Sequence, residues 1–267
     1  MLQTVSLIGA GALAREFASN LAVLGGEWTI KSVLGRSPER LESFTKDFAC
    51  EGFTDFDAFI ETAGEVVIEL AGKPAAQRYA IDVLKTGRRW VSVSIGAYVD
   101  EAFRNEVIET ARAHRTEVHL PHGAIGGLDY LLTSSLYKNT PNVTIETRKG
   151  YKGLAGAPGM EGLDVDPTKE CVVFEGSVDA AVAAFPKNIN VAAAASLASA
   201  NPNITVRIIC SPDAKNNGHR ITLDNGLWSG TMQFASMPDP ANPKTSISTA
   251  WSVLALLKNL SSPLRFF

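Results

Sequence analysis

A glycine-rich turn near the start of the chain constrains the fold more than any other feature. Residues 4–8 are rich in strand-forming side chains, GAGALA follows at residues 9–14, and residues 15–24 have helical spacing. A strand, a G-x-G-x-x-A turn and a helix in this order are typical of a dinucleotide-binding βαβ unit. The glycines let the backbone approach a pyrophosphate, and the helix N-terminus presents amide donors to it. We therefore predict cofactor contacts from Gly9, Ala10, Gly11, Ala12 and Leu13.

The end of the second predicted strand, residues 29–34, bears on the choice of cofactor. Many NAD-binding folds carry an acidic residue there, which accepts hydrogen bonds from the adenosine ribose. Here Arg36 and Ser37 follow the strand instead. A 2′-phosphate can pair with the arginine and hydrogen-bond to the serine, whereas a solvated loop arginine is the alternative interpretation. We therefore expect NADP to be accepted at least as well as NAD.

Strands and helices alternate up to residue 121. Strands are predicted at residues 66–70, 90–94 and 117–120, and helices at 75–86 and 100–113. This alternation predicts an α/β Rossmann domain with a doubly wound parallel sheet. Ligands bind such sheets at the carboxyl ends of the strands. We therefore expect cofactor contacts from Ala71, Gly72 and Ser94.

After Pro121 the pattern changes to consecutive strands with few crossover helices. Strands are predicted at residues 143–147, 205–209, 219–223 and 228–234, and helices at 129–136, 177–184, 189–200 and 246–260. This predicts an α+β domain with a mainly antiparallel sheet. We expect a dinucleotide-binding domain over residues 1–121 and 241–267, with the last helix packing back on it, and a catalytic domain over residues 122–240.

Composition narrows the possible partners. A formal net charge of −3 over 267 residues gives no electrostatic reason to expect nucleic acid or an anionic membrane. The most apolar stretch, residues 191–200, is too short to span a bilayer, and the first residues do not resemble a secretory signal. The three cysteines have no metal-ligand spacing. We expect a cytoplasmic protein without a metal ion.

Motifs in the second half carry a resemblance to a known family. They are GAIGGLD at residues 123–129, FPKNINVAA at 185–193, NGHRI at 217–221 and NPKTS at 242–246. Together with GAGALA and with SIGA at residues 94–97, they resemble the L-aspartate dehydrogenases over nearly the whole chain. That family combines a Rossmann domain with an α+β catalytic domain.

The resemblance implies a reaction and three site residues. The reaction is oxidation of L-aspartate with NAD(P)⁺ to iminoaspartate, which water converts to oxaloacetate and ammonia; in many members the imine feeds NAD biosynthesis. The family's active-site histidine falls on His219, and its cofactor-contacting alanine and asparagine fall on Ala124 and Asn190. Arg36 departs from the family's acidic residue, and His122 stands where a small residue is expected.

The chemistry needs a base and a way to hold a dianion. Hydride leaves Cα when the amine is neutral, so a histidine is suited to take the proton. His219 is our candidate, whereas His114 and His119 are more simply structural, and for His122 a pocket role and a structural role stay equally open. Candidates for binding the substrate are His122, Lys187, Asn188, Lys244, Thr245 and Ser246.

Some of these assignments have alternatives. Thr245 or Ser246 is equally suited to cap the last helix. Lys149 and Lys152 are weaker candidates, because charge runs such as residues 148–152 are usually solvated. Two other functions stay open: a two-domain reductase of the dihydrodipicolinate reductase or homoserine dehydrogenase type, and a non-catalytic NADP-binding sensor. We also expect a homo-oligomer, in the form of a dimer.

Overall fold

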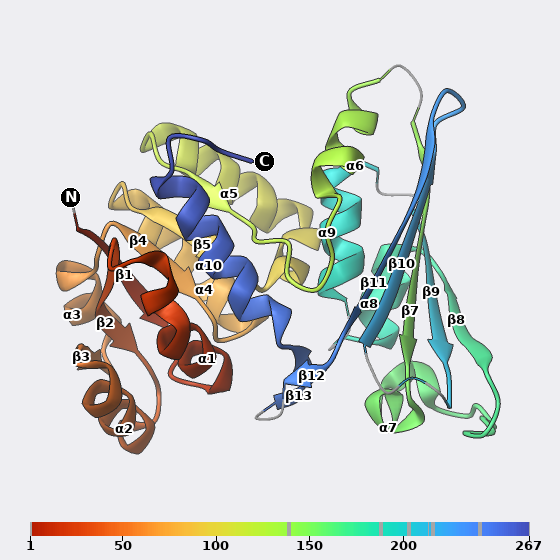
Figure 1. Cartoon of the computed structure of the whole chain (residues 1–267), viewed down its shortest axis with the longest axis horizontal. Coiled ribbons are helices and arrows are strands. Elements are labelled where there is room, and N and C mark those ends of the chain that lie inside the picture. The colour runs from red at the N-terminus through yellow and green to blue at the C-terminus, as the bar shows by residue number, and fades with distance from the viewer. Residues whose placement is uncertain are drawn as a thin grey trace. The chain divides into compact units, whose positions relative to one another are not determined.

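The chain divides into two compact units (Figure 1). The computed structural model describes residues 2–137, 140–186, 189–201, 204–212, 214, 217–239 and 242–266. One unit comprises Met1–Pro121 and Thr249–Phe267, and the other comprises His122–Ser248. Within the described residues, no helix combines the length and the apolar character needed to cross a membrane.

The first unit contains a six-stranded sheet in the order β3-β2-β1-β4-β5-β6. The strands are β1 (Gln3–Ile8), β2 (Trp28–Leu34), β3 (Glu51–Phe53), β4 (Val66–Glu69), β5 (Arg89–Ser92) and β6 (Val118–His119). Every pairing is parallel. The predicted doubly wound Rossmann sheet is therefore confirmed, and its strand order reverses between β1 and β4, where such sheets bind ligands.

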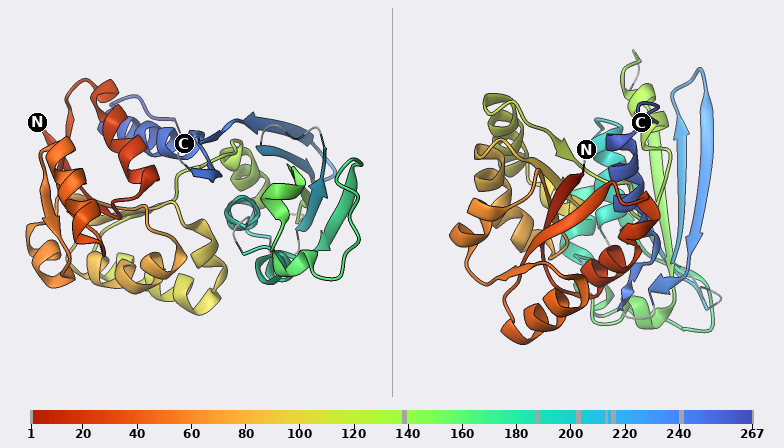
Figure 2. Two further views of the ribbon diagram at one scale, coloured as in Figure 1. Left: turned by 90° about the horizontal axis from the view of Figure 1, so that it is seen from below. Right: turned by 60° about the vertical axis from the view of Figure 1, so that its left-hand side comes forward.

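Helices cover both faces of this sheet (Figure 2). They are α1 (Ala12–Asn20), α2 (Pro38–Phe48), α3 (Phe56–Thr62), α4 (Lys73–Lys85), α5 (Glu101–Ala113) and α10 (Ser248–Ser261). Phe17 of α1, Phe44 of α2 and Leu254 of α10 lie in one buried cluster with the strand residues Val5 and Ile68. The last helix therefore packs in the core of the first unit, as its apolar spacing predicts. On the other face, α4 packs against α5 and β5.

The second unit contains a five-stranded sheet in the order β11-β10-β7-β9-β8. The strands are β7 (Asn142–Lys149), β8 (Cys171–Gly176), β9 (Thr205–Cys210), β10 (Asn217–Asp224) and β11 (Ser229–Ser236). Only the β7–β9 pair is parallel among these described strands, so the prediction of a mainly antiparallel sheet is confirmed. Two short strands, β12 (Pro238–Asp239) and β13 (Asn242–Ser246), pair separately.

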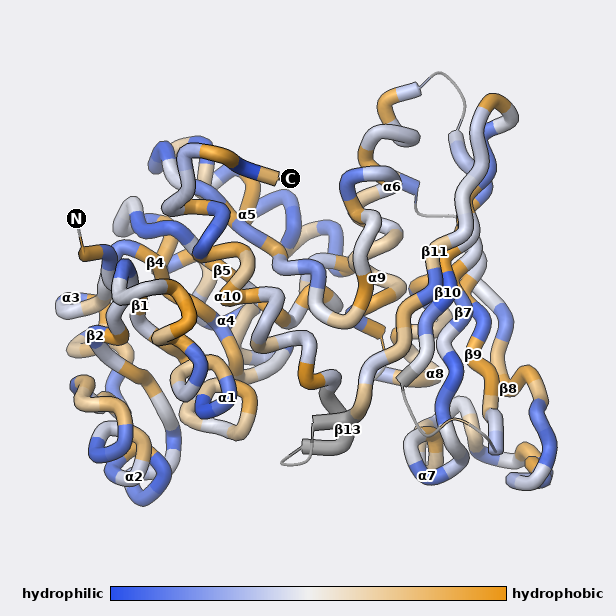
Figure 3. The backbone as a smooth tube through the Cα atoms, viewed as in Figure 1, coloured by the Kyte–Doolittle hydropathy of each residue, from blue (hydrophilic) through white to orange (hydrophobic). Residues whose placement is uncertain are grey.

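The two faces of the five-stranded sheet differ in polarity, and hydropathy alternates along its strands (Figure 3). Buried aliphatic residues such as Ile145, Ile208 and Ile221 occupy one face. The helices of this unit are α6 (Leu128–Ser135), α7 (Tyr151–Leu154), α8 (Val178–Ala184) and α9 (Asn190–Ala198). Helix α9 contributes four buried alanines to the core, and α6 and α8 pack against it.

Candidate active site

The predicted glycine turn links β1 to α1 and has a backbone that only glycine adopts easily. Gly9 has φ of 114°, and its N–H donates to the carbonyl oxygen of Leu34 at 2.8 Å. A Cβ on Gly9 would lie 3.1 Å from the Leu70 carbonyl group. A Cβ on Gly11 would meet no atom within 4 Å. The turn is therefore packed on one side and open to a ligand on the other, at the first residues of α1.

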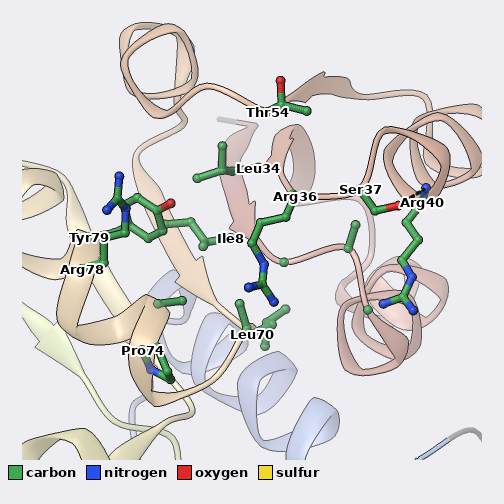
Figure 4. A pocket seen from close by; sticks show the side chains of 16 residues that line it. Ile8, Leu34, Arg36, Ser37, Arg40, Thr54, Leu70, Pro74, Arg78 and Tyr79 are labelled. Atoms are coloured by element: carbon green, nitrogen blue, oxygen red, sulfur yellow. Dashed lines mark hydrogen bonds between the residues drawn. The ribbon is translucent and has the colours of Figure 1, made fainter.

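A pocket of about 570 Å³ opens at the carboxyl ends of β1, β2 and β4 (Figure 4). Its lining includes Gly9, Ala10, Gly11, Arg36, Ser37 and Ala71 from the predicted cofactor contacts. Ala12 and Leu13 do not line it; they begin α1, and Leu13 packs against the core. A pocket at this edge, beside the glycine turn, fits the pyrophosphate and adenosine parts of a dinucleotide.

Positive charge gathers in this pocket. Arg36, Arg40 and Arg78 line it, and no acidic side chain is among its described lining residues. The Arg78 guanidinium lies over the Tyr79 ring at 5.3 Å, and Arg36 projects between Leu34 and Leu70 in Figure 4. Sequence reasoning missed Arg40 and Arg78, which come from helices α2 and α4 rather than from the turn. This environment suits an anionic group on the adenosine side.

Ser37 has a second, structural task. It is the N-cap of α2, and its Oγ accepts a hydrogen bond from the backbone N–H of Arg40 at 3.4 Å. Helix α2 starts in the sequence Ser-Pro-Glu, which combines a capping side chain, a proline in the first turn and an acidic residue. The cap fixes the first residue of α2, and it therefore restrains the backbone of Arg36, which lies between β2 and this helix.

Glu69 ties two strand ends of the first unit together. Its carboxylate is fully buried and accepts five hydrogen bonds: from the backbone N–H groups of Ala71, Gly72 and Ser94, and from the hydroxyls of Ser92 and Ser94. Burial raises the pKa of Glu69, and the hydrogen bonds partly offset that rise. Gly72 and Ser94 do not line the pocket, but both bind this carboxylate. The acidic residue at the end of an apolar strand was the signal that sequence reasoning overlooked.

His219 lies on β10 in the second unit and is 6% exposed. Its Nδ1 shares a hydrogen bond of 3.1 Å with the Thr147 hydroxyl of β7, which is its register partner. Burial lowers the pKa of His219 to about 4, and the positive charge of Lys149 contributes to this. The imidazole is therefore neutral at neutral pH, with Nε2 as the ring nitrogen that Thr147 does not bind.

The interpretation of residues 148–152 as a solvated charged loop is wrong for Lys149. Strand β7 continues through Lys149, whose carbonyl oxygen accepts a hydrogen bond from the Ser211 N–H at 2.9 Å. The side chain is half-buried, and burial lowers the pKa of Lys149 to about 8. Lys152, by contrast, lies exposed on α7. Alternation along β7, which gives Thr147 and Lys149 the same face, was the available signal.

The turn before α6 holds two predicted site residues. His122 is exposed, and its Nδ1 donates to the Ile125 carbonyl oxygen at 2.6 Å, so the ring closes the turn around Ala124. The Ser248 hydroxyl donates to the Gly123 carbonyl oxygen at 3.1 Å and shares a hydrogen bond of 2.7 Å with Ser246. The structure therefore connects Ser246 to the turn that carries His122 and Ala124.

The remaining candidates are less well defined. Asn190 is the first residue of α9 and is exposed. Lys187 and Asn188 lie outside the described residues, as do the side chains of Lys244 and Thr245. The last helix, predicted from residue 246, begins at Ser248, and residues 244–246 form the end of strand β13. Ser246 still assists the start of α10, since its Oγ accepts from the Ser248 N–H at 3.3 Å.

Comparisons with known proteins match both parts of the chain. Residues 131–260 match the family description "Aspartate dehydrogenase, C-terminal", and residues 9–121 match "Homoserine dehydrogenase, NAD binding domain". The L-aspartate dehydrogenase of Methanopyrus kandleri is 34% identical over 267 residues, covering 98% of this chain and 97% of the relative. That of Methanospirillum hungatei is 30% identical over 260 residues, covering 97% of each.

Solved structures extend the comparison. The crystal structure of aspartate dehydrogenase from Thermotoga maritima superposes with a TM-score of 0.76 at 28% identity, covering all of both chains. A hyperthermophilic archaeal homoserine dehydrogenase in complex with NADPH has a TM-score of 0.60 at 12% identity, covering 98% of this chain and 99% of that one, which shows a shared fold. Identity of 30% or more along nearly the full length is found with proteins of one name, and this chain belongs to the L-aspartate dehydrogenase family.

Proposed function

We propose that this protein is an NAD(P)-dependent oxidoreductase that converts L-aspartate to iminoaspartate, which water hydrolyses to oxaloacetate and ammonia. The reverse reaction is reductive amination of oxaloacetate. The observation that carries the proposal is the buried, neutral imidazole of His219, held by Thr147 in the unit that matches the aspartate dehydrogenase C-terminal family. We assign cofactor binding to the first unit, and assign catalysis to residues 122–240.

The cofactor, when bound, supplies the acceptor for the hydride that leaves Cα of the substrate. In our proposal the turn at Gly9, Ala10 and Gly11 and the first residues of α1 hold the pyrophosphate. Arg36 and Ser37 hold a 2′-phosphate, so that NADP is accepted at least as well as NAD. The further cofactor contacts that we propose are Ala12, Leu13, Ala71, Gly72, Ser94, Ala124 and Asn190.

His219 acts as the general acid and base in this proposal. Its low pKa keeps the ring neutral. In the tautomer in which Nδ1 donates to the Thr147 hydroxyl, Nε2 has a lone pair for the proton of the substrate ammonium group or of the attacking water. A pKa of about 4 makes a weak base, but the two carboxylates of the substrate raise it by favouring the imidazolium. His219 therefore gains basicity when the dianion binds. Substrate contacts from His122, Lys187, Asn188, Lys244, Thr245 and Ser246 belong to the same proposal.

A substrate survey tests the activity. Purified protein is given NAD⁺ or NADP⁺ at alkaline pH with L-aspartate, D-aspartate, L-glutamate or L-homoserine, and absorbance of the reduced nicotinamide is followed. Reduction that depends on L-aspartate supports the proposal. Activity with L-homoserine alone would favour a reductase of the homoserine dehydrogenase type. Cofactor binding without reduction by any substrate would favour a sensor.

We further propose that the protein is a cytoplasmic homodimer that supplies iminoaspartate for pyridine nucleotide biosynthesis. Light scattering after size-exclusion chromatography measures the oligomeric state, and a monomeric mass would contradict the dimer. The metabolic role is tested by deleting the coding sequence and measuring growth without external pyridine precursors.

A further inference from the structure

Two of the three cysteines of the chain lie opposite each other in the sheet of the second unit. Cys171 is the first residue of β8 and Cys210 is the last residue of β9, and the two are register partners in this antiparallel pair. Opposite residues of such a pair have Cα atoms about 4.5–5.5 Å apart. A disulfide requires Cα atoms about 4.4–6.8 Å apart. The backbone of the sheet therefore holds the two cysteines at a separation that a disulfide can bridge.

The side chains of this pair start from the same face of the sheet. Cys210 is fully buried, and it lies three residues beyond Arg207, whose guanidinium pairs with carboxylates on the opposite face. Directly opposite residues of a strand pair share a face, so the side chain of Cys171 starts beside that of Cys210. Both carry free thiols. The two sulfur atoms are therefore attached at neighbouring positions on the inner face.

The two thiols differ in their access to solvent. β8 is an edge strand of the five-stranded sheet, and Cys171 at its start is half-buried. β9 lies between β7 and β8, and Cys210 at its end is fully buried. An oxidant that arrives from solvent therefore meets Cys171 first, and Cys210 is placed to react with the oxidised sulfur.

We propose that Cys171 and Cys210 are a site of reversible oxidation, at which hydrogen peroxide converts the two thiols to a disulfide between the native strands. In the first step the Cys171 thiolate attacks a peroxide oxygen, the O–O bond breaks, and a sulfenic acid and one water form. In the second step the Cys210 thiolate attacks the sulfenic sulfur, the S–S bond forms, and a second water leaves. The two thiols lose two electrons, which reduce the peroxide, and their two protons end in the two waters.

The electrostatics of Cys210 favour this order of steps. Burial raises the pKa of the Cys210 thiol, and negative charge on Cys171 raises it further. A sulfenic acid on Cys171 is neutral, so the second contribution disappears once Cys171 is oxidised. Cys210 therefore ionises more readily after its partner has become the electrophile. The inference is independent of aspartate oxidation, because neither thiol takes part in that proposed reaction.

Peptide mapping tests whether the disulfide forms. Folded protein is treated with hydrogen peroxide, the remaining thiols are blocked, and trypsin then places Cys171 in the peptide 170–187 and Cys210 in the peptide 208–215. We expect wild type to yield these two peptides joined and two hydrogens lighter than their sum, and a reducing dithiol to separate them. The control Cys50→Ser, which removes the cysteine of the first unit, should give the same joined peptides.

The variant Cys171→Ser tests the order of the steps. The buried Cys210 should then keep its thiol at least about tenfold longer than in wild type, because it no longer has an oxidised partner to attack. Oxidation of Cys171 to a sulfinic acid while Cys210 stays a thiol would overturn the inference. Disulfides that join separate molecules, or loss of the Cys210 thiol at the wild-type rate in Cys171→Ser, would also overturn it.

Hydrogen exchange tests whether the disulfide fits the native register. The link closes a loop over residues 172–209, which include α8 and α9, and it ties the edge strand β8 to β9. A cross-link that needs no movement of the strands restricts the open states more than the folded one. We expect amides of β8 and β9 to exchange about tenfold or more slowly in the oxidised wild type, and this protection to be lost on reduction. Unchanged or faster exchange in the linked protein would overturn the inference, because the strands would then have to distort to form the bond.

Discussion

His219 is buried among groups that decide its protonation. Its ring is held by Thr147 and is kept neutral by burial and by Lys149. Replacing His219 with alanine removes the base, so we expect kcat with L-aspartate to fall by about 10²–10⁴-fold while NADPH binding is unchanged. Steady-state turnover and fluorescence titration with NADPH measure the two effects. The variant Thr147→Val, which removes the hydroxyl partner but keeps the imidazole, should lose less turnover. Near-normal turnover in a folded His219→Ala protein would reject the assignment.

In our proposal, Arg36 is the residue on which the cofactor preference depends. It projects into a pocket that no acidic side chain lines among the described residues (Figure 4). We expect Arg36→Ala to weaken NADP binding by about tenfold or more, because a charge-assisted hydrogen bond is lost, and to leave NAD binding within twofold. Arg78→Ala is the comparison, since Arg78 lies over Tyr79 and does not follow the β2 end. Equal losses for both cofactors in Arg36→Ala would contradict a 2′-phosphate contact.

The place of a single residue in the candidate site was predictable where a local motif specifies it. It was not predictable where tertiary packing specifies it. The glycine turn predicted the pocket edge at Gly9 and Gly11, because turn geometry is a local property. Lys149 was misjudged because the burial of its stem depends on which strand pairs with β7, and local charge density carries no information on that. Arg78 enters the pocket from α4, which is distant in sequence from the glycine turn. Arg40 enters it from α2, a helix that was not predicted.

The carboxylate of Glu69 connects the ends of strands β4 and β5 through hydrogen bonds. It accepts N–H groups of the turn after β4 and of Ser94 after β5, so both loops at the ligand-binding edge depend on one side chain. Its donors lie on two separate segments of the chain, one with Ala71 and Gly72 and the other with Ser92 and Ser94. The hydrogen bonds of Glu69 therefore fix the spacing of the two loops in the first unit.

Substitution of Glu69 tests whether its carboxylate holds these two loops in place. Glu69→Ala leaves several buried donors without an acceptor, and we expect the free energy of unfolding to fall by about 2–4 kcal/mol. NADPH binding should weaken as well, because Ala71 and Gly72 lose the bonds that hold their turn. Glu69→Gln keeps one acceptor oxygen and should lie between wild type and Glu69→Ala. Denaturant unfolding and NADPH titration are the measurements. Loss of stability without loss of affinity would restrict Glu69 to a structural role.

Elements with a clear apolar run or helical spacing were predicted, whereas β3, β8 and α2 were missed. The strands β1, β2, β4 and β5 have apolar runs that a buried parallel strand requires, and all were expected. β3 has three residues, too few for any periodicity. β8 was missed although its first four residues, Cys-Val-Val-Phe, form the kind of short apolar run that is typical of a strand. Helix α2 was missed although its Ser-Pro-Glu start is a recognisable helix signal.

At the scale of the whole molecule, the first unit is built from both ends of the chain. β1 and α10 lie in one buried cluster, whereas the second unit is a continuous segment, His122–Ser248. Alternation of strands and helices predicted the parallel sheet, and the loss of alternation after Pro121 predicted the antiparallel one. Sequence periodicity does not indicate the residue at which the second unit ends before α10. The strands there, β12 and β13, are too short to show a pattern.

The packing of α10 against β1 in one buried cluster predicts how the first unit unfolds. Leu254 of α10 is 2% exposed in the cluster, whereas Trp251 of the same helix is 43% exposed. We expect Leu254→Ala to destabilise the first unit by about 2–5 kcal/mol and Trp251→Ala to change little. NADPH at about 100 times its dissociation constant should restore about 2.7 kcal/mol, because it binds only the folded unit.

Tryptophan fluorescence can report the first unit alone. Trp28 and Trp90 are buried there, and Trp228 is the one tryptophan of the second unit. In a Trp228→Phe background, the unfolding transition seen by fluorescence should move to lower temperature with Leu254→Ala and back upward with NADPH. The second unit has its own core around Ile145 and Ile221, so a probe placed there should respond less to either change. If Leu254→Ala shifts the fluorescence transition as little as Trp251→Ala does, α10 does not hold the first unit together.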